Sequence, residues 1–140
     1  MPDTPNPAPV GLPRRLAAIL YDGLLLLAIW FAATVPWMAV TGAAVTSSDP
    51  LFRLYLTAIG LLYFCGFWTH GGQTLGMRTW RFAVTGIDGS PVGGTQALRR
   101  GLAAILSWGL LGLGFWSALL RSDRRTWHDR LSGTELRRVG

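Results

Sequence analysis

An aspartate inside an apolar run is the residue with the most evident chemistry in this sequence. Asp22 interrupts the run that begins RRLAAILYDGLLLL, and the next charged residue is Asp49. Inside a membrane, a charged side chain costs about 2.5–3.5 kcal/mol on insertion scales, so it is retained where it binds or pairs with something. Asp22 is therefore either a site for an ion or a proton, or a structural partner that locks two helices together.

Two arginines precede the same run. Arg14 and Arg15 stand where basic residues anchor a helix at lipid headgroups. Arg15 and Asp22 share one helix face, but about 10.5 Å of helix axis separates them, which is long for a direct contact. We therefore expect a water, a lipid phosphate or a tail arginine such as Arg130 beside Asp22.

The last polar position of interest follows the third apolar run. Asp129 lies between His128 and Arg130 in RRTWHDRLSGT. Taken alone, this tripeptide is typical of a solvated turn, and its histidine could shuttle a proton. Asp129 could instead cap a helix or pair with arginines next to the membrane.

Familiar catalytic and metal-binding arrangements are missing from the sequence. It has no Walker loop, no G-x-S-x-G and no HExxH motif. Its one cysteine, Cys65, and its two histidines, His70 and His128, do not have a metal-ligand spacing. We expect neither an enzyme nor a bound metal or cofactor.

The composition favours a membrane protein. The 140 residues suit one domain, and 50% are hydrophobic while only 14% are charged; a soluble domain carries about 25% charged residues. The net charge is +6, and the basic residues flank apolar runs instead of forming one polar face. That pattern predicts contact with anionic lipid headgroups and argues against a nucleic-acid partner.

Three apolar segments must position the polar residues, and they cover residues 16–40, 51–69 and 101–120. The first two have about the 20 residues that cross a bilayer as a helix. The third contains Gly109, Gly112 and Gly114, so it either breaks and re-enters or crosses as a third span.

The remaining segments have other characters. Residues 1–13 hold five prolines and predict a disordered tail, so that 14–140 form one membrane domain. Residues 80–85 alternate with period two and precede a turn at Asp88-Gly89, which predicts a small β-hairpin through residues 90–93. Residues 134–139 could add a strand, if they lie on the same side of the membrane.

The arginine distribution predicts the topology. Two arginines precede the first segment, Arg53 alone lies in the first loop, and four lie between the second and third segments. This places the N-terminus and the hairpin in the cytoplasm. Six arginines follow the third segment, which favours a segment that turns back over one that crosses. The predicted fold class is an all-α membrane protein with two full transmembrane helices, a glycine-broken third segment and a small cytoplasmic hairpin.

Three stretches together carry a family resemblance: RRLAAILYDGLLLL at 14–27, GGQTLGMRTWRFAV at 71–84 and RRTWHDRLSGT at 124–134. With them the chain resembles the RDD family of bacterial membrane proteins, named for one arginine and two aspartates. The resemblance assigns these to Arg15, Asp22 and Asp129. It implies a place in the bacterial cytoplasmic (inner) membrane. The family's function is largely undefined, although transport of an unknown ligand and ion–proton exchange have been suggested.

Two functions remain open on this basis. The chain could transport an ion or small ligand as a homo-oligomer, because two or three spans are too few to enclose a pathway. Alternatively, it is an accessory or scaffolding membrane protein that docks a membrane partner or organises lipid. In either case we expect Arg15, Asp22 and Asp129 in one polar cluster at the cytoplasmic face, with Arg14, His128 and Arg130 as auxiliary residues.

Overall fold

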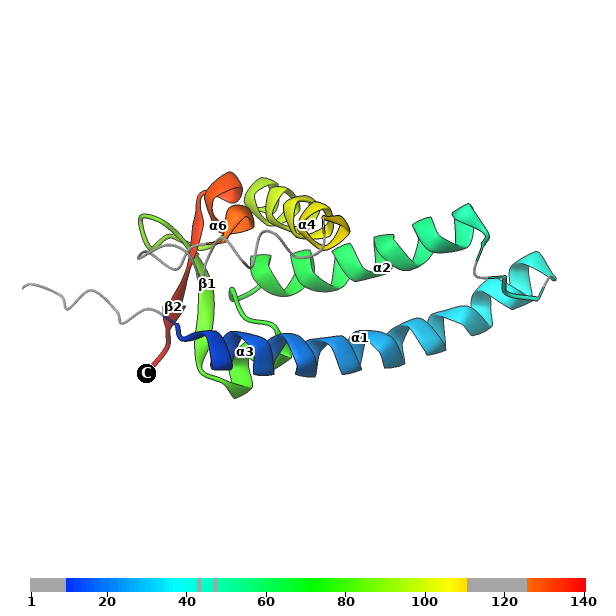
Figure 1. The fold of residues 1–140 in the computed structure, drawn as a ribbon, viewed down its shortest axis with the longest axis horizontal. Coiled ribbons are helices and arrows are strands. Elements are labelled where there is room, and N and C mark those ends of the chain that lie inside the picture. Colours follow the sequence, from blue (N-terminus) through cyan, green and yellow to red (C-terminus); the bar gives the residue numbers. More distant parts are fainter. Residues whose placement is uncertain (1–9, 43, 47, 111–125) are drawn as a thin grey trace, which may run out of the picture.

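The computed structural model describes residues 10–42, 44–46, 48–110 and 126–140. Its two longest helices, α1 (Leu12–Thr41) and α2 (Pro50–Thr69), run antiparallel along the long axis of the molecule (Figure 1). Within the described ranges, these two helices are long and apolar enough to cross a membrane. The structure thus confirms helices of spanning length in the predicted segments 16–40 and 51–69.

Local sequence explains where the two helices begin and end. Pro13 and Pro50 lie in the first turns of α1 and α2, where a missing N–H costs nothing. The side chain of Asp49 caps α2 by accepting a hydrogen bond from the Leu51 N–H at 2.9 Å. Gly42 ends α1 in the left-handed conformation, with φ of 63°.

The outer surfaces of the two helices are apolar. Leu24 is 61% exposed, and Phe31 and Leu62 are each 73% exposed. Large exposed apolar surfaces on a water-soluble monomer are rare because they promote association. These helices therefore suit a hydrocarbon environment.

Aromatic residues hold the two helices together away from the polar end. The indole of Trp30 donates a hydrogen bond to the Leu56 carbonyl at 2.9 Å. Nearer the loop, the Trp37 ring packs against Phe52 and Tyr55, with ring centroids 5.5 and 5.0 Å apart. Contacts between opposed aromatic rings stabilise a helix pair beyond their buried area.

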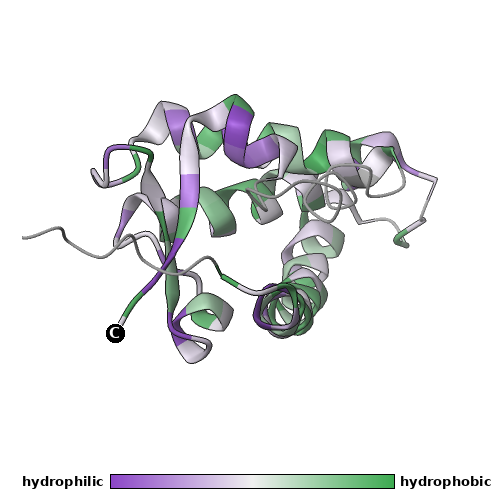
Figure 2. Ribbon diagram, turned by 60° about the vertical axis from the view of Figure 1, so that its left-hand side comes forward, coloured by the Kyte–Doolittle hydropathy of each residue, from purple (hydrophilic) through white to green (hydrophobic). Residues whose placement is uncertain are grey.

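Four short elements gather at the end where α1 begins and α2 ends (Figure 1). They are α3 (Leu75–Thr79), β1 (Phe82–Gly86), α6 (Trp127–Ser132) and β2 (Thr134–Arg138). We call these four elements the polar cap. Figure 2 shows hydrophilic residues gathered on the polar cap and hydrophobic residues along α1. The molecule thus has an apolar hairpin with a polar end.

The two strands of the polar cap pair antiparallel, with Phe82 opposite Arg138 and Gly86 opposite Thr134. The expectation of a strand in residues 134–139 is confirmed, and so is a small β-sheet. The local hairpin through residues 90–93 is wrong, because those residues form no strand. Since hydrogen-bonded strands must meet in space, residues 82–86 and 134–138 lie at the same end of the molecule.

The sequence after the turn explains why the local hairpin does not form. The turn itself is present, with φ of 82° at Gly89 and a hydrogen bond from the Gly86 N–H to the Ser90 carbonyl at 2.9 Å. Pro91 then has no N–H to give to a sheet. The chain enters the next helix at Gly94, which leaves no room for a returning strand.

That helix, α4 (Gly94–Gly109), crosses the hairpin and is foreshortened in Figure 1, where α1 and α2 lie in the plane. Its buried face carries Ala97, Arg100, Gly101 and Ser107, and it packs on α2 and α6. Its opposite face is apolar and exposed, at Leu98, Leu102, Ile105 and Leu106. Only residues 101–109 of the predicted third segment fall in this helix. Residues 111–120 lie outside the described residues, so their break or span stays a prediction.

The N-terminal boundary differs from the prediction. Residues 1–9 of the expected tail lie outside the described residues. Val10, however, is fully buried against Ala18 and Phe82, and α1 already begins at Leu12. An apolar side chain that reaches the core gains about 1.5–3 kcal/mol, enough to fix the chain at this point.

Candidate functional site

Asp22 lies on α1 and faces the polar cap, where its carboxylate accepts three hydrogen bonds. It is 3% exposed. Oδ1 accepts from the Gly76 N–H at 2.9 Å and from the Tyr63 hydroxyl at 3.1 Å, and Oδ2 accepts from the Thr74 hydroxyl. Charge-assisted hydrogen bonds of this kind are about twice as strong as neutral ones. One carboxylate thus fastens α1 to α2 and α3.

The glycine-rich connection GGQTLG is shaped to present these donors. Gly72 has φ of 71°, and its carbonyl accepts a hydrogen bond from the Val84 N–H at 2.7 Å. Thr74 caps α3, because its hydroxyl oxygen accepts from the Met77 N–H while the hydroxyl hydrogen goes to Asp22. The first turn of α3 has a positive end that favours the anion.

Gly76 is where α3 touches α1, so adding a methyl group there should separate them. A Cβ at Gly76 would lie 2.5 Å from the Ala18 carbonyl oxygen and 2.9 Å from the Asp22 carboxyl group. We expect Gly76→Ala to lower the free energy of unfolding in detergent by about 1–3 kcal/mol. Gly23→Ala is the control, because its Cβ would meet nothing within 4 Å. Equal stability of both variants would contradict the close approach.

Arg15 and its neighbour Arg14 have different surroundings. Arg15 is 8% exposed, and its Nε donates to the Val10 carbonyl at 3.0 Å, whereas Arg14 is exposed. Among the described residues, Asp22 pairs with no arginine. Of the neighbours expected for Asp22, Arg130 does not pair with it; Tyr63, Thr74 and Gly76 donate hydrogen bonds to its carboxylate.

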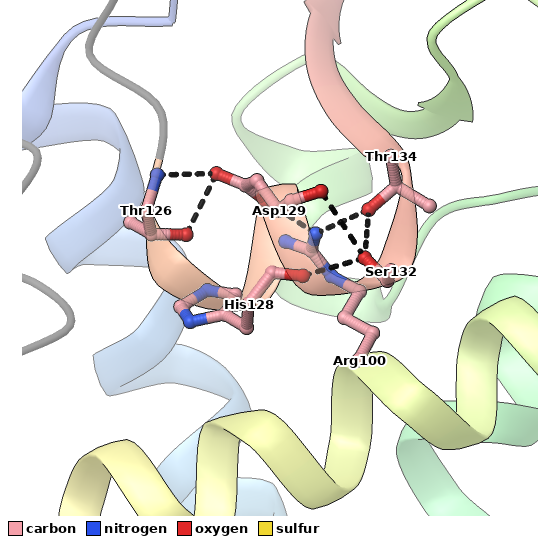
Figure 3. Close-up of polar contacts among 6 residues, drawn as sticks. All are labelled: Arg100, Thr126, His128, Asp129, Ser132 and Thr134. Atoms are coloured by element: carbon pink, nitrogen blue, oxygen red, sulfur yellow. Dashed lines mark hydrogen bonds and ion pairs between the residues drawn. The ribbon is translucent and has the colours of Figure 1, made fainter.

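Asp129 is the centre of a second polar cluster, drawn in Figure 3. It is 1% exposed and pairs with Nη1 of Arg100, which comes from α4. Its other oxygen accepts from the Thr126 N–H at 2.9 Å and from the Thr126 hydroxyl at 2.7 Å, which caps α6. Asp129 thus both caps a helix and pairs with an arginine. The flanking Arg130 is exposed on α6.

Arg100 connects this cluster to the rest of the fold. Its Nη1 also donates to the Thr134 hydroxyl at 2.8 Å, and that hydroxyl lies 2.7 Å from the hydroxyl of Ser132 (Figure 3). The guanidinium carbon lies 5.1 Å from the ring centroid of Trp68 on α2. A cation over an indole face is attracted to it. One buried arginine therefore joins α4 to α2, α6 and β2.

Burial and charge shift the pKa values in this cluster. Burial alone would raise the pKa of Asp129, but Arg100, His128 and the Thr126 donors outweigh it and hold that pKa below its usual range. Burial lowers the pKa of His128 to about 4, and the charge of Arg100 adds to the shift while Asp129 opposes it. His128 is therefore a neutral imidazole near pH 7.

This shift predicts a loss of stability in mild acid. The unfolded imidazole titrates near pH 6.5, so between that pH and about 4 the unfolded chain binds a proton that the folded chain refuses. We expect the free energy of unfolding to fall by about 2 kcal/mol from pH 7 to pH 5. His128→Gln should flatten this dependence, whereas His70→Gln, at an exposed position, should leave it unchanged. If the free energy of unfolding of His128→Gln fell equally steeply with pH, a group other than His128 would cause the pH dependence.

A cavity of about 660 Å³ lies between the helices and touches both clusters. Arg15, Asp22, Arg100 and His128 line it at the polar end. Asp129 stands behind Arg100 and does not line it. The structure thus brings Arg15, Asp22 and His128 to one cavity, while Asp129 is connected to that cavity through its partners Arg100 and Thr126.

No group of three or more histidine, cysteine or acidic residues that could hold a metal occurs in the part of the chain the structure describes. The residues that sequence reasoning missed are the partners: Arg100, Thr74 and Tyr63. A signal existed for two of them. Thr74 precedes a short helix in the manner of an N-cap, and Arg100 is the last charge before an apolar run.

Comparison with known proteins agrees with this architecture. No curated protein and no solved structure matches the chain. The model of the RDD family matches residues 9–133, which covers α1, α2, the glycine-rich connection, α4 and α6. The match therefore includes every residue of the two polar clusters except Thr134. Because it covers far more than half of the chain, the protein belongs to the RDD family and is an RDD-family membrane protein.

Proposed function

We propose that the protein resides in a bacterial cytoplasmic membrane with the polar cap in the cytoplasm. The arginine distribution supports this side. Arg53 lies at the loop end of the hairpin, while the other described arginines lie at or next to the polar cap. Short loops rich in arginine stay in the cytoplasm. Because β1 pairs with β2, both termini would then lie on the cytoplasmic side.

We propose that the protein is an accessory or scaffolding membrane protein, not an enzyme. The single observation that carries this is that each of its two signature carboxylates is buried and bonded on both oxygens by three donor groups of the protein. Asp22 accepts from Tyr63, Thr74 and Gly76. Asp129 accepts from Arg100 and Thr126. Buried carboxylates that are bonded in this way fasten elements together, and in this role they hold the polar cap on the hairpin of α1 and α2.

The polar cap offers surfaces for a partner. Trp80, Ile87 and Val139 are 41%, 53% and 44% exposed on or beside its strands. The apolar outer face of α4 suits the border of a bilayer, because exposed leucines there can enter hydrocarbon while Arg99 reaches the headgroups. A second copy of the chain or a membrane partner would meet the cap at this border.

Site-specific photo-crosslinking in intact membranes tests the scaffold role. A photoreactive residue at Ile87, directly after β1 of the polar cap, should form a discrete protein adduct of reproducible mass. The same residue at Leu62, which is exposed in the middle of α2, should crosslink to lipid. Lipid adducts alone at both positions would contradict docking through the cap.

A second candidate, transport of an ion or small ligand by an oligomer, is favoured by one observation. The cavity places Asp22 and His128, which could carry protons, beside two arginines. In reconstituted vesicles, this candidate requires ion-dependent proton flux that Asp22→Asn abolishes. The scaffold proposal expects background flux from both proteins.

A further inference from the structure

The cavity between α1, α2 and α4 has an unusual combination of walls. Its middle is lined by apolar residues, among them Leu24, Leu61, Phe64 and Ile105. Its polar lining residues Arg15, Asp22, Arg100 and His128 lie towards the polar cap. A cavity of about 660 Å³ falls within the roughly 300–1,000 Å³ of small-ligand sites.

The cavity is elongated along α1. Its lining runs from Arg15 to Trp30 on that helix, which is about 22 Å along the axis. One leaflet contributes about half of the roughly 30 Å hydrocarbon core. The cavity is therefore long enough for an acyl chain of the leaflet that adjoins the polar cap.

The walls decide what can fill this space. Leu20 and Leu24 line the cavity and are also 67% and 61% exposed, so they form a rim that opens towards the membrane. Water is a poor occupant of an apolar cavity, because it needs two to four polar partners. An empty cavity would forfeit dispersion contacts along its whole lining. An acyl chain from the bilayer needs no polar partners and makes dispersion contacts with the apolar lining.

The polar end selects the headgroup. Arg15 from α1 and Arg100 from α4 line it, and the exposed Arg14 and Arg99 lie beside them. Asp22 and Asp129, the latter paired with Arg100, offset two of these four positive charges, which leaves a net charge of +2 at this end. Arginine binds phosphate oxygens with two parallel hydrogen bonds where geometry allows. The positive end thus matches an anionic phosphate.

We propose that this cavity is a binding site for an anionic phospholipid, with one acyl chain between α1, α2 and α4 and the phosphate at the Arg15 end. The inference rests on the proposed membrane placement and deepens the scaffold role, because a held lipid would be the one the protein organises. It does not require a protein partner at the cap.

Native mass spectrometry of the full chain, purified in mild detergent and exchanged against defined lipids, tests the proposal. We expect phosphatidylglycerol to be retained about tenfold more than phosphatidylcholine, and oleic acid not to displace it. Arg15→Gln should reduce that preference about fivefold, the effect of one basic residue near an anionic surface. Arg14→Gln, at the exposed neighbour, is the matched control for charge and should reduce it less.

A second pair of variants tests the acyl chain. Gly60 lines the cavity, and a Cβ there would make ordinary contacts of 3.6 Å with Leu26 and 3.8 Å with Trp30. Gly60→Leu should therefore obstruct the cavity between α1 and α2 and lower phosphatidylglycerol retention about tenfold, because less of the acyl chain can be buried there. Gly66→Leu changes the same helix where a Cβ would meet nothing within 4 Å, and it should retain the lipid.

Three results would overturn the lipid site. They are equal retention of the two phospholipids by the parent protein, equal retention by Gly60→Leu and Gly66→Leu, and displacement by oleic acid. Unchanged unfolding midpoints ensure that retention is compared between folded proteins. If the lipid site is wrong, the protein adduct at Ile87 is still expected. If no protein adduct forms at Ile87, lipid retention is still expected, so the two proposals can fail separately.

Discussion

Asp22→Ala is expected to release α3 from α1 and to lower the free energy of unfolding by about 3 kcal/mol. The substitution leaves the Thr74 hydroxyl, the Gly76 N–H and the Tyr63 hydroxyl without their acceptor. Each buried donor left unsatisfied costs about 1–3 kcal/mol. The alanine variant also no longer places a charged side chain in the membrane, which offsets about 2.5–3.5 kcal/mol of that loss. The net decrease in the free energy of unfolding is therefore smaller than the sum of the three lost hydrogen bonds.

Two measurements check this expectation. Unfolding in mixed detergent micelles, followed by tryptophan fluorescence, gives the free energy. Limited trypsin digestion at Arg78, which lies on α3, reports whether α3 has left α1. Asp88→Ala is the control, because Asp88 is an exposed aspartate in the loop after β1. If Asp22→Ala and Asp88→Ala had the same free energy of unfolding and the same rate of cleavage at Arg78, the Asp22 carboxylate would not fasten α3 to α1.

Asp22→Asn refines the same argument. The amide oxygen can still accept from Gly76 and Tyr63, and its NH₂ group can donate to the Thr74 oxygen after the hydroxyl rotates. We therefore expect this variant to lose about half of what the alanine variant loses, because hydrogen bonds to charged groups are about twice as strong as neutral ones.

Arg100→Leu is expected to destabilise the protein by about 3–5 kcal/mol, because it leaves the Asp129 carboxylate buried without its counter-charge. The ion pair is 3% and 1% exposed at its two side chains, so water cannot replace the guanidinium. The change also removes the hydrogen bond to Thr134 and the contact with the Trp68 ring. Arg99→Leu removes the neighbouring exposed arginine and should cost less than 1 kcal/mol.

A double variant separates the pair from its parts. Asp129→Asn combined with Arg100→Leu removes both charges, so the double variant should be less unstable than the sum of the two single variants. Unfolding free energies of the four proteins at pH 7 give the coupling. Strict additivity would contradict a direct ion pair.

The sequence predicted the two membrane helices because their signal is local. A run of apolar residues long enough to span a bilayer identifies itself without knowledge of the rest of the chain. The predicted segments 16–40 and 51–69 lie within the helices Leu12–Thr41 and Pro50–Thr69. A strand in residues 134–139 was also expected, and β2 occupies residues 134–138.

The pairing partners could not be predicted in the same way. Asp22 was identified as a functional or locking residue, but its donors lie 41 to 54 residues further along the chain. Asp129 was expected to pair with an arginine next to the membrane, while its partner Arg100 lies 29 residues before it. Such contacts depend on how the connection and α4 fold back, which no local pattern reveals.

The local hairpin failed for a related reason. A turn at Asp88-Gly89 indicates that the chain reverses direction, but it does not determine which strand pairs with residues 82–86. Pro91 and the start of α4 at Gly94 were the available evidence against a local partner. The distant strand 134–138 filled the position instead.

The central claim is that the signature residues hold one polar cap, built from both halves of the chain, on the cytoplasmic end of a membrane hairpin. The most direct test is a reporter fused after Gly140 that is active in only one compartment. Because β2 pairs with β1 and α6 packs on α4, we predict a cytoplasmic signal together with a cytoplasmic N-terminus. A signal from the opposite side would place Asp129 across the bilayer from Arg15 and Asp22, and would contradict the shared cap.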